Sequence, residues 1–181
     1  MQSNENIPEN ILIEKCVAFD RNYQEIFYRR FADKMFRVCL TYSDSYDDAA
    51  DILQEGFIKI FKKIHQFNNE GSLEGWVRKV IVNTALENYR KKIKEIEKIK
   101  EVNLTDEGYE FDMDGLGSQE IIEMVNHLPS KAQVVLKLYA IEGYSHKEIA
   151  AQLNISEGTS KSQLNRARKL LKDVLVKFNG V

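Results

Sequence analysis

The sequence predicts an all-α protein of two helical domains joined by an acidic flexible linker. Apolar residues recur at helical spacing along most of the 181 residues, and the alternation typical of strands is almost absent. Residues 101–117 break this pattern with Asn, Asp, Glu and three glycines, a composition typical of linkers. We therefore expect an N-terminal lead-in over residues 1–20, a first domain over residues 21–100, the linker over residues 101–117 and a second domain over residues 118–181.

The first domain is expected to contain three long helices. One runs from about Asn22 to Leu40, a second starts near Asp47, and after a turn a third runs from Leu73 toward Lys100. The apolar residues predicted to meet in the core are Tyr23, Ile26, Phe27, Phe31, Met35 and Val38 in the first helix and Ala50, Leu53, Phe57, Ile60, Ile64 and Phe67 in the second.

The second domain is expected to begin with two short helices. Ser118 caps the first, which ends near His127. Pro129 opens the other, which passes through Ala132, Val135, Leu136 and Tyr139 and ends at Gly143.

A helix-turn-helix follows. Ser145 and Glu148 have the spacing of a capping box that opens a helix over residues 146–153. Asn154 suits a left-handed helix end, and Ser156 suits the cap of the next helix. That next helix should bury Leu164, Ala167, Leu171 and Val174 and project Lys161, Ser162, Asn165, Arg166 and Lys169. Such polar and cationic side chains suit a DNA major groove; a capped hairpin with a basic solvated face is the alternative.

Charge is distributed unevenly along the chain. Residues 76–100 carry eight Lys or Arg and three Glu, and residues 158–181 carry six Lys or Arg and one Asp, so each segment has a net charge of +5. Residues 101–127 carry eight acids and no Lys or Arg. Two basic segments around an acidic connector indicate two contacts with a polyanion, although solvated helix faces give the same counts.

The second helix carries an acidic front. Its first acids are favoured by the helix dipole, but the outward row of Asp51, Gln54, Glu55 and Ile58 adds an apolar residue to the acidic strip. We interpret this row as a protein-binding face.

The third helix carries a basic row opposite its apolar face. The row contains Lys79, Asn83, Arg90, Lys94 and Lys98 and is interrupted by Glu87. An amide and cations near aromatic residues suit unstacked bases, and a solvated face is the alternative. Trp76 is either a core residue or a stacking platform.

These segments resemble the sigma-70 family of RNA polymerase sigma factors, in its extracytoplasmic-function (ECF) group. The motifs similar to sigma region 2 are residues 51–57 (DILQEGF), 71–76 (GSLEGW) and 83–85 (NTA). Those similar to region 4 are residues 128–129 (LP), 141–150 (IEGYSHKEIA) and 158–168 (GTSKSQLNRAR). Both sets in this order cover about residues 21–177.

The resemblance implies a sigma factor that binds core RNA polymerase and directs recognition of the minus-10 and minus-35 promoter elements. The implied polymerase-binding residues are Asp48, Asp51, Gln54, Glu55 and Ile58. The implied minus-10 residues are Trp76, Lys79, Asn83 and Arg90, and the implied minus-35 residues are Thr159, Lys161, Ser162, Asn165, Arg166 and Lys169. Family habit also implies an anti-sigma factor as a partner, and Gln163 stands where many relatives have a basic residue.

Other chemistry finds little support in the sequence. Cys16 and Cys39 lack ligand spacing and are expected to be reduced packing residues, and we expect no metal, no cofactor and no catalytic activity. No apolar run approaches the length of a membrane span, which favours a cytoplasmic protein. A conventional ligand- or phosphorylation-sensing regulator remains the alternative, and an enzyme is disfavoured because the three histidines are scattered.

Overall fold

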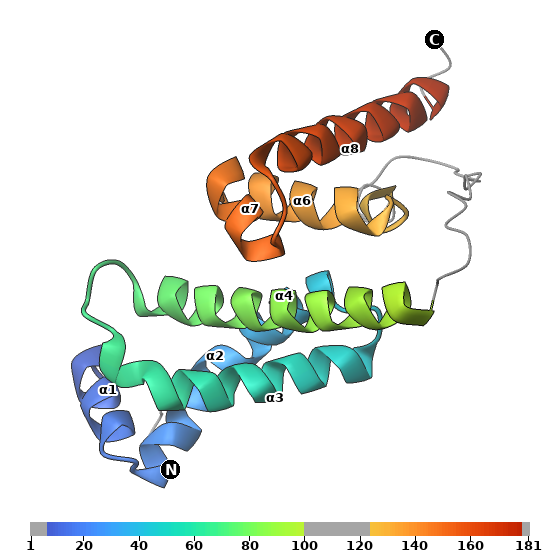
Figure 1. Cartoon of the computed structure of the whole chain (residues 1–181). Helices are drawn as coiled ribbons and strands as arrows, with labels where there is room; N and C mark the ends of the chain where they lie inside the picture. Colours follow the sequence, from blue (N-terminus) through green and yellow to red (C-terminus); the bar gives the residue numbers. More distant parts are fainter. Residues whose placement is uncertain (1–6, 100–123, 179–181) are drawn as a thin grey trace. The chain divides into compact units, whose positions relative to one another are not determined.

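The structure, a computed structural model, describes residues 7–99 and 124–178, and within them every regular element is helical (Figure 1). The chain divides into two compact units, residues 1–96 and 97–181. The helices are α1 (Glu9–Val17), α2 (Arg21–Tyr42), α3 (Tyr46–Lys63), the 3-10 turn η2 (Ile64–Gln66), α4 (Leu73–Ile99), α6 (Ser130–Ala140), α7 (His146–Leu153) and α8 (Glu157–Phe178). The predicted fold class is confirmed; the linker and the Ser118 cap lie outside the described residues.

The core of the first unit forms where α2 faces α3. The ring of Phe27 on α2 is fully buried, with its centroid 4.8 Å from that of Phe31 and 5.6 Å from that of Phe61. Phe57 meets the same ring edge-on at 6.5 Å. Aromatic side chains bury large apolar areas, so this cluster fixes how the two helices pack.

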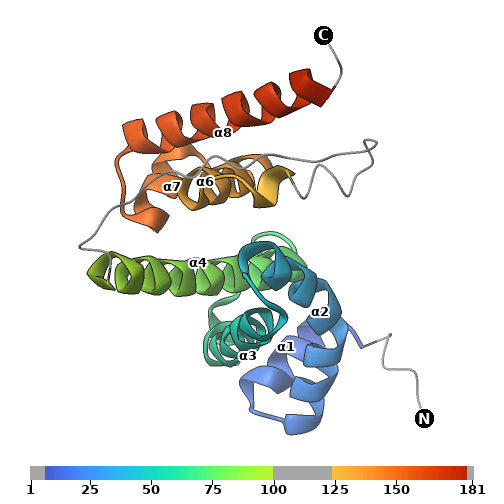
Figure 2. The ribbon, with the colours of Figure 1, turned by 90° about the vertical axis from the view of Figure 1, so that its right-hand side faces the viewer.

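Helix α1 lies beside α2 and contributes to the same unit (Figure 2). Its Leu12 and Cys16 are fully buried. The guanidinium of Arg30 on α2 donates a hydrogen bond to the carbonyl oxygen of Ile7, at 2.9 Å. The segment before residue 21, which was expected to be a lead-in, therefore holds a packed helix.

One predicted core position in α3 was wrong. Ala50 is exposed, and its neighbour Ala49 is fully buried instead. The inward stripe of α3 also includes Ile52 and Gly56, which shifts its centre by one residue. A Cβ at Gly56 would clash with Cδ1 of Ile81 on α4, so the absence of a side chain lets α3 and α4 approach closely.

The second unit is a helix-turn-helix built on α6. The capping box is confirmed: the Oγ of Ser145 accepts a hydrogen bond from the Glu148 backbone, and the Glu148 carboxylate accepts one from the Ser145 backbone. Asn154 ends α7 in the left-handed region (φ 55°, ψ 48°). The Oγ of Ser156 accepts a hydrogen bond from Thr159 N at 3.0 Å, as expected of a cap for α8. The apolar core here contains Leu128, Ala132 and Ala167, with Leu136, Leu170 and Leu171 packed against it.

Candidate functional site

The outward face of α3 presents the predicted mixture of acid and apolar residue. Asp51 and Gln54 are exposed. Ile58, one turn after Gln54, is 47% exposed. Asp48 is half-buried, with its carboxylate 3.6 Å from Nζ of Lys92 on α4. An exposed aliphatic side chain beside carboxylates suits contact with a protein surface.

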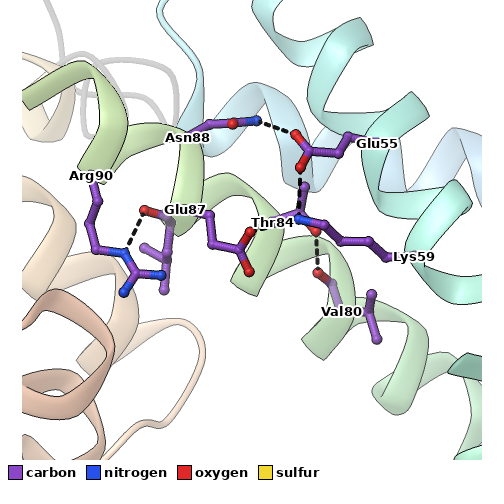
Figure 3. A network of polar contacts seen from close by, with 8 residues as sticks. Glu55, Lys59, Val80, Thr84, Glu87, Asn88 and Arg90 are labelled. Carbon is purple, nitrogen blue, oxygen red and sulfur yellow. Dashed lines mark hydrogen bonds and ion pairs between the residues drawn. The ribbon is translucent and has the colours of Figure 1, made fainter. Parts of the chain in front are cut away.

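Glu55 differs from the rest of that row because it turns toward α4. Its Oε2 accepts a hydrogen bond from the Asn88 amide at 3.2 Å, and its Oε1 lies 2.8 Å from Nζ of Lys59 (Figure 3). The hydrogen bond from Lys59 lowers the pKa of the Glu55 carboxyl. Glu55 is thus half-buried and carries part of the packing between α3 and α4.

A groove of about 500 Å³ runs between α3 and α4 near the end of α2. Among the described residues, five carboxylates line it, including those of Asp48, Asp51 and Glu55, against two lysines. Lys92 is one of these lysines, and the hydrogen bond that it donates to Asp44 raises its pKa. The groove therefore continues the acidic character of the outward α3 face.

The basic row of α4 is only partly exposed. Lys79 and Lys94 face solvent, whereas Asn83 and Arg90 are half-buried. The Lys98 side chain is not among those that the structure describes. The Oδ1 of Asn83 is buried, and no hydrogen-bond donor reaches it among residues 7–99 and 124–178. The Nε of Arg90 donates to the Leu86 carbonyl oxygen at 3.4 Å. Both side chains are therefore only partly accessible to solvent.

Trp76 is neither fully core nor fully exposed. Its ring is half-buried and lies 5.8 Å from the ring of Phe67, at an interplanar angle of 57°. The turn between these two residues includes Asn69 and Gly71, both with positive φ. The two aromatic rings therefore form a partly open surface where the turn meets α4.

One side of the first turns of α8 faces solvent. Its hydroxyl groups are held locally, since Ser162 Oγ donates to the Thr159 carbonyl oxygen at 2.9 Å and Thr159 Oγ1 lies 2.9 Å from Ser156 Oγ. The exposed residues that were predicted to contact DNA are Thr159, Lys161, Ser162, Asn165, Arg166 and Lys169. All six predicted residues thus lie on the solvent side of one helix.

Sequence reasoning missed a polar cluster behind this helix. The Nδ1 of His146 lies 2.9 Å from the Oγ of Ser160, which is fully buried. The His146 ring stacks on Tyr139 at 4.9 Å, and the Arg168 guanidinium sits 5.6 Å from the centre of the same tyrosine ring. The available signal was a serine on the apolar side of α8, one turn before Leu164.

Cys16 and Cys39 are free and buried, as expected of packing residues. Burial raises the pKa of the Cys16 thiol to about 11 and that of Cys39 to about 12. In the described part of the chain, no helix is both long and apolar enough to cross a membrane.

Comparison with known proteins identifies both units. Residues 27–94 match the family model for sigma-70 region 2, and residues 118–171 match that for sigma-70 region 4. The chain is 26% identical to the ECF RNA polymerase sigma-E factor of Haemophilus influenzae, over 93% of this chain and 96% of that protein. It is 30% identical to the ECF RNA polymerase sigma factor SigE of Mycolicibacterium smegmatis over 84% of this chain, and it spans 61% of that longer protein.

A solved structure gives the same fold. The sigma factor RpoE of Bartonella quintana, in its complex with the anti-sigma factor NepR, aligns with a TM-score of 0.52 and 22% identity over 83% of this chain and 95% of that one. The helical fold agrees with the sequence motifs, and so does the order of the two regions along the chain, with region 2 before region 4. The chain therefore belongs to the sigma-70 family of RNA polymerase sigma factors, in its ECF group, and acts in promoter recognition and transcription initiation.

Proposed function

We propose that the chain binds core RNA polymerase through the outward face of α3 and promoter DNA through α4 and α8. The polymerase-binding residues would be Asp48, Asp51, Gln54, Glu55 and Ile58. The exposed Ile58 among carboxylates carries this proposal, because a hydrophobic anchor in a charged rim suits a protein partner.

The two basic helices divide promoter recognition between them. Trp76, Lys79, Asn83 and Arg90 would hold the unpaired strand of the minus-10 element, where aromatic rings stack on bases and cations hold phosphates. Thr159, Lys161, Ser162, Asn165, Arg166 and Lys169 would read the minus-35 element as duplex, because the front of α8 is exposed and polar.

Partners and location follow from the same proposal. The similar Bartonella quintana protein was solved with an anti-sigma factor, which supports an anti-sigma partner for this chain. Promoter recognition inside the cell requires a cytoplasmic protein. The chain would have no catalytic activity and no cofactor of its own, because the polymerase performs the chemistry.

The test is transcription in vitro with core polymerase and a library of promoter fragments. Adding the chain should give transcripts that start at defined sites, and the selected fragments should share two spaced elements. Transcripts no different from those of core polymerase alone would overturn the proposal. Tight sequence-specific binding of the isolated chain to duplex DNA would favour a conventional regulator instead.

A further inference from the structure

One carboxylate interrupts the basic row of α4, at Glu87. It follows Asn83 by four residues and precedes Arg90 by three, so all three side chains lie on the same side of the helix. A free carboxylate there would repel the phosphates of a strand held by its neighbours. In the structure, Oε2 of Glu87 lies 2.7 Å from Nζ of Lys59 on α3 (Figure 3).

Lys59 is held firmly enough to balance that charge. Its side chain is 23% exposed, and its Nζ also lies 2.8 Å from Oε1 of Glu55. Burial alone would lower the pKa of Lys59, but the hydrogen bonds that its ammonium donates to the Glu55 and Glu87 carboxylates outweigh this effect and keep the pKa above its usual value. A partly buried pair of this kind is screened by salt less than an exposed one.

We propose that Lys59 is a positioning residue for minus-10 recognition, which draws the Glu87 carboxylate toward α3 and offsets part of its charge. Asn83 and Arg90 then meet the DNA strand beside a carboxylate whose charge Lys59 partly offsets, since the same ammonium also pairs with Glu55. This inference rests on the proposed function, and Lys59 acts through Glu87 without touching DNA. Its loss leaves Glu87 uncompensated next to the phosphates, which should weaken binding of the unpaired strand roughly three- to tenfold.

The experiment is a double-mutant cycle on the assembled holoenzyme. The probe is the labelled, single-stranded non-template minus-10 segment of a promoter that the holoenzyme selects. The chain is added in saturating excess, so that all core polymerase carries it. Lys59→Gln should bind it roughly three- to tenfold more weakly, and Glu87→Gln at least as tightly as the unaltered chain. The double variant should return to within about twofold of the unaltered chain. The matched control is Lys62→Gln, an exposed lysine on the same helix, which should change affinity less than about twofold.

Other outcomes overturn the inference. If Lys59 served only to brace α3 on α4, Glu87→Gln would weaken binding as much as Lys59→Gln, and the double variant would not recover. If Lys59 contacted a phosphate, Lys59→Gln would lower the salt slope by about 0.7 and Glu87→Gln would not rescue it. An unchanged affinity for Lys59→Gln also refutes it. Failure of the unaltered holoenzyme to transcribe or bind the probe would instead count against the proposed function.

Discussion

The Nδ1 of His146, at the first position of α7, lies 2.9 Å from the Oγ of Ser160 on α8. Ser160 is fully buried, so this pair connects the two helices of the helix-turn-helix from the inside. The same imidazole stacks on Tyr139 of α6. This side chain of α7 thus contacts both α6 and α8 in the unit that we propose reads duplex DNA.

Ser160→Ala should destabilise the second unit by about 1 kcal/mol, because the His146 ring nitrogen loses its buried partner. Thermal unfolding measures the change. Ser130→Ala, at an exposed serine in the first turn of α6, serves as the control and should shift stability by less than about 0.5 kcal/mol. Equal effects of the two changes would mean that the His146 contact adds nothing.

Ile58→Glu should weaken binding to core polymerase roughly ten- to a hundredfold, since it buries a charge in place of an apolar anchor. Asp51→Lys should weaken it less, because a rim charge mainly affects association. Binding of labelled chain to core polymerase measures both, with circular dichroism to check helix content. Glu14→Lys, a charge reversal on the exposed side of α1, is the control. Unchanged affinity in both test variants would remove this face from the interface.

Arg166→Ala should cost about 1–3 kcal/mol and relax preference at one position of the minus-35 element, if the guanidinium contacts a base edge. Lys169→Ala, farther along α8, should weaken binding equally across sequences and lower the salt slope by roughly one. Holoenzyme binding to promoters that vary only in the minus-35 element, at several salt concentrations, separates the two. Uniform weakening by Arg166→Ala would make that residue a backbone contact and transfer base reading to Lys161, Ser162 or Asn165.

Gly56→Ala should destabilise the first unit by about 1 kcal/mol. A gain of about 0.5–1 kcal/mol from helix propensity is outweighed by overpacking against Ile81, which is fully buried. Denaturant unfolding should also show that Gly56→Ala is harmless or stabilising once Ile81→Val has removed the clashing Cδ1. If Gly56→Ala alone, with Ile81 unchanged, stabilised the chain, the interface between α3 and α4 would accommodate a methyl group without overpacking.

The two buried thiols should make stability fall at high pH. Burial raises the pKa of Cys39 from 9.0 to about 12, so the unfolded chain loses this proton first. The contribution of the protonated Cys39 thiol to the free energy of unfolding is therefore complete below about pH 9 and is lost as the pH rises through about 12. Urea unfolding should show that the free energy of unfolding falls less between pH 8 and pH 10.5 in a variant with Cys16→Ala and Cys39→Ala than in the unaltered chain. An equal loss would assign the effect to other groups.

Local rules predicted local structure well. The capping box of Ser145 and Glu148 and the left-handed Asn154 depend on residues a few positions apart, and both are confirmed. The outward direction of Asp51, Gln54 and Ile58 follows from the same helical period, and it is also confirmed. Their contacts with polymerase remain a prediction.

Contacts between helices could not be read from the sequence. Lys59 and Glu87 are 28 residues apart, and His146 and Ser160 are 14 apart, so their meeting depends on how each helix is rotated in the packed unit. The error at Ala50 has the same origin, because two adjacent alanines carry no signal about which one faces inward. The half-buried state of Asn83 likewise arises from the packing of α4 and not from its own sequence period.

The core that joins Leu128, Ala132 and Ala167 draws only on the C-terminal part of the chain, and the Phe27 cluster draws only on the N-terminal part. Each unit thus carries its own buried residues and helix caps within one continuous stretch of sequence. Exchange of the C-terminal stretch between relatives would therefore transfer a unit that brings its own core and helix caps. Under the proposed function, preference for the minus-35 element would in this way change without alteration of the α3 face that we propose binds the polymerase.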